Sequence, residues 1–282
     1  MKLTYDIRDL VPYINWVYFY FAWQVKDEVS QQRMRREAEA FLKEYDGKYK
    51  AYALFDIVDA HSDNDDIVIH GEGCLAKGER RIPLLRQQEV GSEFLCLADF
   101  LSPITLPSSH SSLHLSPVTH HQKLGLFATS VDRGMESDFD HDPYQKMMAQ
   151  LLADRLAEAA AERMHEEVRK HYWGYAPDEN LSIHEMQLER FQGIRPAVGY
   201  PSLPDASMNF LLDDLLDMKQ IGISLTESGA MRPHASVSGL MISHPKAHYF
   251  SIGKIGEDQL ADYARRRQMP VETIRKFLSA NI

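Results

Sequence analysis

The sequence GIRPAVGYPSLPD, from Gly193 to Asp205, decides how the C-terminal half of this chain can fold. Pro196, Pro201 and Pro204 fix φ at about −65° and push the residues before them out of the helical region. This backbone must therefore run extended and stiff, and it cannot pair as a central strand. We expect its N–H and C=O groups to be available to a ligand.

Two residues in this stretch suit a ligand. Gly199 lets a ligand approach the main chain closely, and Arg195 offers a planar guanidinium that can pair with a carboxylate. The alternative is a surface loop between two helices, which is what clusters of proline and glycine most often form. The residue types alone favour the loop, so the flanking sequence has to decide.

Long sequence segments on both sides of this stretch favour a ligand-binding segment over a surface loop. They read ADRLAEAAAERMHEEVRKHYWGYAPDENLS (153–182), LTESGAMRPHASVSGL (225–240) and SHPKAHYFSIGKI (243–255). In this order they resemble the activation domain of cobalamin-dependent methionine synthase, the module that binds S-adenosylmethionine. The resemblance covers nearly the whole chain, is densest from Pro143 to Ser279 and thins between Gly47 and Gly134.

The resemblance implies which residues contact S-adenosylmethionine. The family motif R-P-A-P-G-Y falls on Arg195 to Tyr200, with Val198 in place of a proline. Two family glutamates correspond to Glu158 and Glu189. A family tyrosine pair corresponds to Tyr249 and Phe250, and a family aspartate corresponds to Asn15, so this chain departs from the family at Phe250 and Asn15. The implied ligand residues are Asn15, Glu158, Glu189, Arg195, Ala197, Gly199, Tyr200, Tyr249 and Phe250. Asp154 and Tyr200 are implied to face the cobalamin-binding module.

The reaction that the resemblance implies is reductive reactivation of cobalamin. An electron from a flavodoxin-like donor converts inactive Co(II) to Co(I), which attacks the sulfonium methyl of S-adenosylmethionine. The metal centre is the nucleophile, so no side chain is expected to act as acid, base or nucleophile, and the cobalamin belongs to a partner module. Two alternatives stay open: a module that reactivates another corrinoid protein, or a ligand-binding protein without methyl transfer.

The composition excludes several classes of protein. The 282 residues include 31 basic and 41 acidic side chains, which argues against a nucleic-acid partner and suits a cationic ligand such as a sulfonium. The two cysteines, Cys74 and Cys96, suggest neither a disulfide framework nor a thiolate metal site. No signal segment and no apolar run of membrane-spanning length is apparent. We therefore expect a cytoplasmic protein.

Two histidine patterns resemble metal or corrinoid sites but do not qualify. The segment from Ser102 to His121 holds four histidines, yet zinc sites usually fix histidine at helical spacing or pair it with cysteine, so no metal is predicted. The string Asp59-Ala60-His61 begins like the D-x-H-x-x-G signature of cobalamin-binding modules, but Asn64 stands where the glycine is needed. No corrinoid-binding module is visible in this chain.

Periodicity predicts one α+β domain over residues 1–282, with a twisted antiparallel sheet flanked by helices. The glycine-rich loop of dinucleotide-like methyltransferase folds is absent, so we expect a non-Rossmann binder of S-adenosylmethionine. The aromatic block from Asp6 to Trp23 looks like core. Helices are predicted at 27–45, 142–171, 182–190, 206–218, 257–267 and 270–279. Strands are predicted at 51–57, 66–69, 81–85, 93–97, 123–128, 221–225, 235–242 and 249–253.

Overall fold

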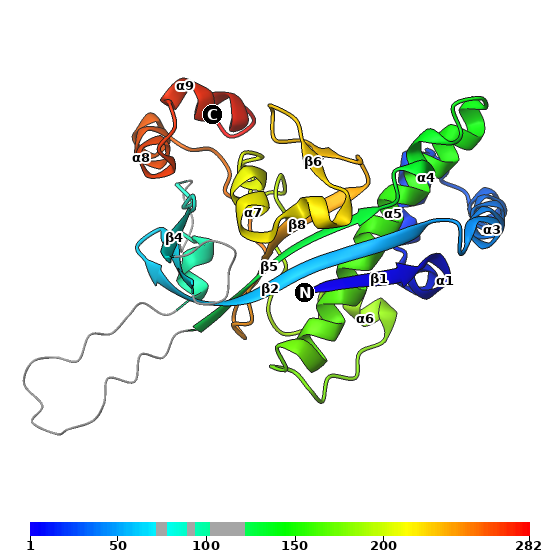
Figure 1. Ribbon diagram of the computed structural model, residues 1–282, viewed down its shortest axis with the longest axis horizontal. Coiled ribbons are helices and arrows are strands. Elements are labelled where there is room, and N and C mark those ends of the chain that lie inside the picture. The colour runs from blue at the N-terminus through cyan, green and yellow to red at the C-terminus, as the bar shows by residue number, and fades with distance from the viewer. Residues whose placement is uncertain (72–77, 89–93, 102–121) are drawn as a thin grey trace, which may run out of the picture. The chain divides into compact units, whose positions relative to one another are not determined.

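The computed structural model describes residues 1–71, 78–88, 94–101 and 122–282, and these form an α+β fold (Figure 1). The chain divides into two compact units, each assembled from three separate segments. The first unit comprises Met1–Asp56, Phe127–Phe191 and Leu216–Gly239, and the second comprises Ile57–Leu126, Gln192–Leu215 and Leu240–Ile282. The predicted fold class, helices with an antiparallel sheet, is confirmed. That the whole chain is one domain stays a prediction.

Among the described residues, one sheet contains six strands, five of them in the order β4-β3-β2-β5-β8 and the sixth, β1, pairing with β2 off this path. The β2–β3 hairpin turns at Asn64, whose φ of 54° lies in the left-handed region that asparagine tolerates. Its register pairs Ala60 with Ile69, so both enter the core. The strands are β1 (Lys2–Asp6), β2 (Lys50–Asp63), β3 (Asp66–Gly71), β4 (Gly78–Pro83), β5 (Gln122–Val131) and β8 (Ser236–Met241).

The central helix of the first unit is α5 (Pro143–Glu167), which passes behind β1 and the start of β2 in Figure 1. It begins as predicted, because the Asp142 carboxylate caps it by accepting from the Tyr144 and Gln145 N–H groups. Its buried face is mostly alanine and leucine, and the Thr129 hydroxyl of β5 donates to the Ala157 carbonyl over 3.0 Å. Around it lie α1 (Ile7–Leu10), α2 (Trp16–Ala22), α3 (Glu28–Tyr45), α4 (Gly134–Ser137) and α6 (Ile183–Gln187).

The expectation that the N-terminal aromatic block is core is only partly correct. Trp16 and Phe19 of α2 are buried, but Val17, Tyr18 and Phe21 are 68%, 60% and 82% exposed. A helix of two turns buries one face and leaves the other outward, so a sequence that is apolar all round must expose part of itself. The result is an apolar surface on α2.

The second unit has its own core, built by α8 (Glu257–Arg267), α9 (Val271–Phe277) and the segment between Ile252 and Ile255. Leu260 and Ile274 are fully buried in it. Most of α7 (Met208–Leu216) also belongs to this unit. These helices agree with the predicted ones, whereas residues 249–253, predicted as a strand, form no strand.

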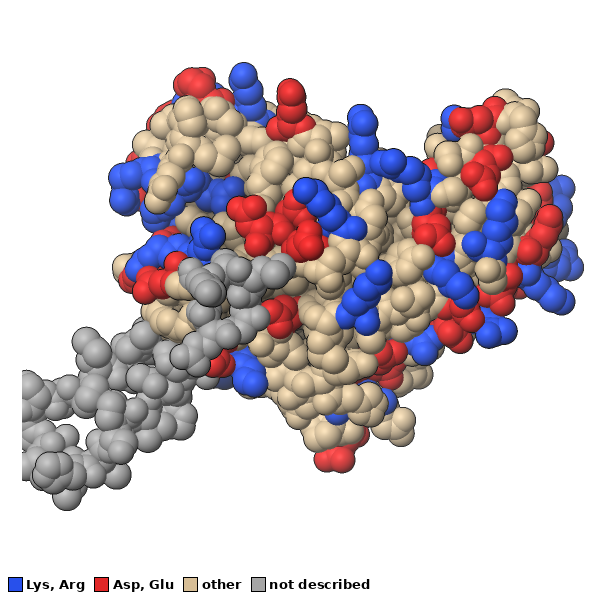
Figure 2. Space-filling view, in the orientation of Figure 1, with Lys and Arg blue, Asp and Glu red and all other residues tan. Residues whose placement is uncertain are grey.

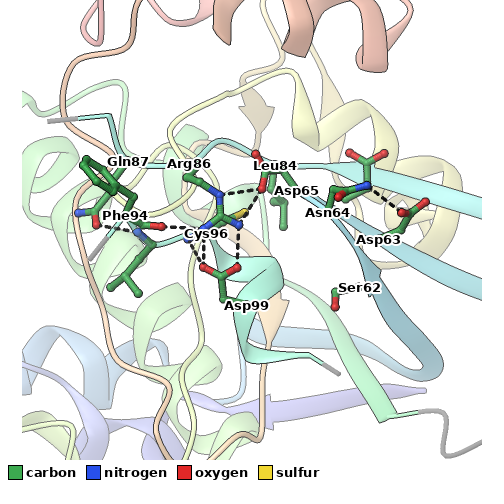
Figure 3. A network of polar contacts seen from close by, with 12 residues as sticks. Ser62, Asp63, Asn64, Asp65, Leu84, Arg86, Gln87, Phe94, Cys96 and Asp99 are labelled. Atoms are coloured by element: carbon green, nitrogen blue, oxygen red, sulfur yellow. Dashed lines mark hydrogen bonds and ion pairs between the residues drawn. The ribbon is translucent and has the colours of Figure 1, made fainter. Parts of the chain in front are cut away.

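A network around Arg86 fixes the second unit near the β2–β3 turn (Figure 3). The guanidinium binds the Asp99 carboxylate through two hydrogen bonds of 2.7 and 2.8 Å, donates to Asp65 Oδ1 over 2.8 Å, and reaches the Phe94 carbonyl. The main chain of Arg86 also exchanges two hydrogen bonds with the Gln259 side chain of α8. The side chain and main chain of Arg86 thereby connect its own segment to the β2–β3 turn, to residues 94–99 and to α8.

The strand predicted at 93–97 is wrong in its described part. Cys96 forms only an isolated bridge with Arg86, and Leu97–Phe100 is a 3₁₀ turn. Cys96 is fully buried, and this burial raises the pKa of its thiol to about 12. Cys74 and the histidine-rich segment 102–121 lie outside the described residues.

Three observations bear on the classes excluded above. No helix among the described residues is long and apolar enough to cross a membrane. Within residues 1–71, 78–88, 94–101 and 122–282, no three metal-binding side chains cluster. Basic and acidic side chains are interspersed on the face drawn in Figure 2.

Candidate functional site

The segment from Gly193 to Asp205 is held by main-chain hydrogen bonds to the end of β8. Ile194 and Ile242 exchange two such bonds, each of 2.9 Å, and the Leu240 N–H donates to the Pro196 carbonyl over 3.0 Å. The expectation that these backbone groups would be available to a ligand is therefore wrong at Ile194 and Pro196. A proline removes only its own N–H, so the neighbouring groups could still pair.

Two consecutive turns shape the middle of the segment. The Tyr200 N–H donates to the Ala197 carbonyl over 3.2 Å, and Gly199 between them has a φ of 87°. A positive φ at the third residue is the requirement of a type II turn, and it explains the glycine. The Leu203 N–H then donates to the Tyr200 carbonyl over 2.9 Å. Tyr200 joins the two turns with its side chain 52% exposed.

The residues after Ser243 hold the other edge of the segment. The Ile252 N–H donates to the Pro201 carbonyl over 2.9 Å, and the Ser202 hydroxyl bonds to both the N–H and the C=O of Phe250. The Arg195 N–H donates to the Tyr249 hydroxyl over 2.9 Å. The structure thus brings Arg195 to Tyr249, which lies 54 residues further along the chain and is followed directly by Phe250.

Asp205, at the end of the segment, is an anchor that the sequence analysis missed. It is 1% exposed, and its carboxylate accepts three hydrogen bonds of 2.8 Å, two from Ser207 and one from the Tyr263 hydroxyl of α8. Burial and this carboxylate raise the pKa of Tyr263 well above its usual value. A Pro-Asp pair directly before a helix was the available signal.

Two predicted residues of the first unit lie on one face of α5. Asp154 and Glu158 are four residues apart and half-buried. Asp154 Oδ1 lies 3.4 Å from His234 Nδ1, and burial raises the pKa of this carboxyl although His234 opposes the shift. Asn15 lies elsewhere in this unit, where its side-chain oxygen accepts from the Val17 N–H over 3.2 Å and caps α2.

A cavity of about 370 Å³ lies in the first unit. Its walls include His234, the partner of Asp154, and the side chains of Arg133 and Arg232. Glu136 also lines this cavity, so its walls carry both basic and acidic side chains.

Glu189 is exposed and has an unusual backbone. Its φ of 56° lies in the left-handed region, directly after α6. Its N–H donates to the Met186 carbonyl over 2.9 Å, and the Arg190 N–H donates to the Glu185 carbonyl over 3.1 Å. These two bonds define a Schellman motif, in which the left-handed position is usually glycine.

A family model described as the activation domain of vitamin B12 dependent methionine synthase matches residues 6–268. The chain belongs to this family. A crystal structure described as the MetH reactivation domain bound to AdoHcy is similar to the activation domain described here, with 35% sequence identity and a TM-score of 0.87. The alignment covers 100% of this chain and 90% of that one.

This membership confirms the resemblance noted in the sequence. The activation domain is part of methionine synthase, a methyltransferase. Which of its residues contact S-adenosylmethionine stays a prediction.

Proposed function

We propose that this chain binds S-adenosylmethionine and supports the reductive methylation of Co(II) cobalamin to methylcobalamin on a partner module of methionine synthase. The observation that carries this proposal is the similarity to a domain described as bound to AdoHcy. AdoHcy is S-adenosylmethionine without its methyl group. A protein that holds the product of methyl transfer in this way is a reasonable model for one that holds the donor.

The donor set of the chain suits the chemical groups of S-adenosylmethionine. The Arg195 guanidinium can pair with the carboxylate, and Glu158 and Glu189 can attract the ammonium and the sulfonium. Tyr200 and Tyr249 offer aromatic faces to the adenine and the sulfonium methyl. The two turns that present Tyr200 are fixed by main-chain bonds, so little of this arrangement has to be ordered on binding.

The chain itself needs to orient reactants rather than move protons. Cobalamin, when its module docks, supplies the metal that accepts the methyl group. Holding two reactants in line can lower a barrier by about 7–11 kcal/mol, and exclusion of water protects the reduced metal. No acid, base or nucleophile from this chain is required, and the electron comes from a flavodoxin-like donor.

Glu158 has a constrained electrostatic role in this proposal. A carboxylate about 4 Å from a sulfonium attracts it by about 4 kcal/mol at an effective dielectric constant of about 20. Methyl transfer neutralises the sulfur, so this attraction stabilises the substrate more than the transition state. A half-buried carboxylate, partly screened by water, keeps the contact moderate.

Asp154 belongs to the surface on which we propose that the cobalamin module docks. Its neighbour Arg155 lies 5.6 Å from the ring centroid of Tyr18, on the exposed face of α2. Exposed apolar side chains such as Phe21 favour the binding of a partner, because the partner removes them from water. The exposed face of α2 would therefore extend this docking surface.

The test combines the pure chain with a separately prepared cobalamin module in the Co(II) state, S-adenosylmethionine and a low-potential reductant. We expect the absorption spectrum to change to that of methylcobalamin only when both proteins are present. The pure chain alone, given homocysteine and methyltetrahydrofolate, should form no methionine.

The alternatives make different predictions. Methylation of another corrinoid protein, but not of the methionine synthase module, would favour a reactivator of that protein. Saturable binding without methylation of either would indicate a ligand-binding protein. Methionine formation by the pure chain would contradict the proposal that it acts only with its partner module.

A further inference from the structure

Glu189 has a left-handed backbone, with a φ of 56°. In the Schellman motif after α6, a glycine would occupy this position without strain, whereas a residue with a Cβ atom is disfavoured. Strained backbone of this kind tends to persist where function requires a particular side chain. Some neighbouring contact must then hold the turn in place.

Arg169 contacts the chain on both sides of this turn. Its Nη2 lies 3.7 Å from the sulfur of Met186, three residues before Glu189. Its Cζ lies 4.2 Å from the ring centroid of Phe191, two residues after Glu189. His165 also contacts Phe191, because the two rings meet edge-on with their centroids 5.0 Å apart.

Arg169 is itself rigidly held. Its side chain is 0% exposed, and it binds the Glu179 carboxylate through Nε at 2.9 Å and Nη2 at 2.6 Å. It lies in a π-helical turn (Val168–Tyr172) at the end of α5, a distortion that often occurs near functional sites. Its Nη1 has no hydrogen-bond partner among the described residues.

A buried ion pair of this kind is weak evidence for a contribution to stability. Replacing such a pair by well-packed apolar residues is often neutral or stabilising, because both charges lose their hydration. The contacts of Arg169 indicate a role in positioning instead. Its planar guanidinium contacts both Met186 and Phe191, and the hydrogen bonds to Glu179 fix its orientation.

We infer that Arg169 is a positioning residue: paired with Glu179 and packed against Met186 and Phe191, it holds the turn that presents Glu189 to the cationic part of S-adenosylmethionine. This inference rests on the proposed function, because it needs Glu189 to contact the ligand. Arg169 is buried and acts only through Glu189.

The decisive experiment is a double-mutant cycle on S-adenosylmethionine affinity, measured by calorimetry on the full chain. Glu189→Gln should weaken binding by at least tenfold, since a charge-assisted contact is lost. Arg169→Lys, which keeps the charge but not the planar fork, should weaken binding about tenfold in the wild-type background. In the Glu189→Gln background, Arg169→Lys should change the affinity by less than about twofold, because the two residues act as one.

A merely structural role predicts a different pattern. Arg169→Lys would then weaken binding by the same factor in both backgrounds, and this result would overturn the inference. Arg163→Lys is the matched control, because Arg163 pairs with Glu167 on the same helix at 3.1 Å and lies over the Tyr5 ring, 4.9 Å from its centroid. It should leave affinity unchanged.

Two further variants test the same inference independently of Arg169→Lys. If Arg169→Lys does not fold, Glu179→Gln weakens the same pair with little change of volume and should show the same dependence on Glu189. Glu189→Gly should raise the thermal midpoint by roughly 2–4 °C while weakening binding, since glycine relieves the left-handed strain.

The outcomes also separate this inference from the proposed function. If the wild-type chain does not bind S-adenosylmethionine, the proposed function fails first. If the wild type binds and Glu189→Gln binds equally well, only the inference fails.

Discussion

The N–H of Arg195 donates to the Tyr249 hydroxyl over 2.9 Å, so two predicted ligand residues are coupled through the main chain of one and the side chain of the other. Tyr249→Phe removes this bond, which contributes about 0.5–1.5 kcal/mol. We expect S-adenosylmethionine affinity to fall about two- to tenfold by calorimetry. Tyr144→Phe serves as control, because it removes a hydrogen bond of 2.8 Å between the Tyr144 hydroxyl and Glu37, away from the predicted ligand residues, and should leave affinity unchanged. An unchanged affinity for Tyr249→Phe would show that the coupling is irrelevant to binding.

Removing the Arg195 side chain tests the carboxylate contact directly. A charge-assisted bond contributes about 1.5–3 kcal/mol, so Arg195→Ala should weaken S-adenosylmethionine binding about 10- to 150-fold. Arg190→Ala is a suitable control, because Arg190 is exposed and its guanidinium lies 3.7 Å from the Glu185 carboxylate. If affinity survives with an unchanged circular dichroism spectrum, Arg195 is a structural residue.

Val198 offers a test of preorganisation. It occupies the second position of the turn from Ala197 to Tyr200, where the family motif has proline and where a type II turn favours proline. Val198→Pro should stabilise the fold by about 0.4–1 kcal/mol in chemical denaturation, chiefly by restricting the unfolded chain. Val237→Pro, at a buried position of β8, should instead destabilise it. A loss of stability for Val198→Pro would mean that the turn is not of this type.

Asn15 combines a structural and a predicted ligand role. Its side-chain oxygen caps α2, and an aspartate can make the same cap with a charge that favours a helix N-terminus. Asn15→Asp should therefore keep the fold intact and tighten S-adenosylmethionine binding about five- to tenfold, if the ammonium lies near. Asn15→Ala should cost about 0.5–2 kcal/mol of stability through loss of the cap.

An analogue of S-adenosylmethionine without the ammonium separates these effects. It should gain nothing from Asn15→Asp. If the complete ligand also gains nothing, the contact implied by the family does not occur at this position.

Asp154 should make stability depend on pH. Burial raises the pKa of its carboxyl in the folded state, while His234 and Arg155 lower it and Glu136 raises it further. The folded state therefore binds this proton more tightly than the unfolded state does. The resulting stabilisation of the folded state is fully present below the unfolded pKa of 3.8 and is lost as pH rises through the folded pKa.

Asp154→Asn removes this titration. The variant should have a higher thermal midpoint than the wild type at pH 7, and the difference should shrink as pH falls towards 4. A difference that stays constant over this range would show that Asp154 does not titrate differently in the folded chain.

The sequence was sufficient for the longer helices and most long strands, because caps and periodicity are local, but it did not predict the short helices α1, α2 and α4 or the strand β1. Asp142 before Pro143 set the start of α5 correctly. The strand predicted at 249–253 was wrong for a non-local reason. The alternation of apolar residues suggested a strand, but hydrogen bonds join Phe250 and Ile252 to Ser202 and Pro201 instead of to a neighbouring strand.

The candidate site was predictable only in part. The string around Arg195 pointed to the ligand, but its engaged backbone and the anchor at Asp205 depend on partners more than 40 residues away. The contacts of Arg169 with Glu179, Met186 and Phe191 are closer in the chain, but no local pattern in the sequence marks them. A buried arginine looks like any surface arginine until the chain around it is folded.

Each of the two units is built from three stretches that alternate along the chain. Strand β2, one continuous run from Lys50 to Asp63, contributes its first half to one unit and its second half to the other. Deletion mapping will therefore mislead here, since any terminal truncation long enough to remove one unit also removes parts of the other. Insertions or fusions intended to separate the two sets of ligand residues must be made at several positions at once.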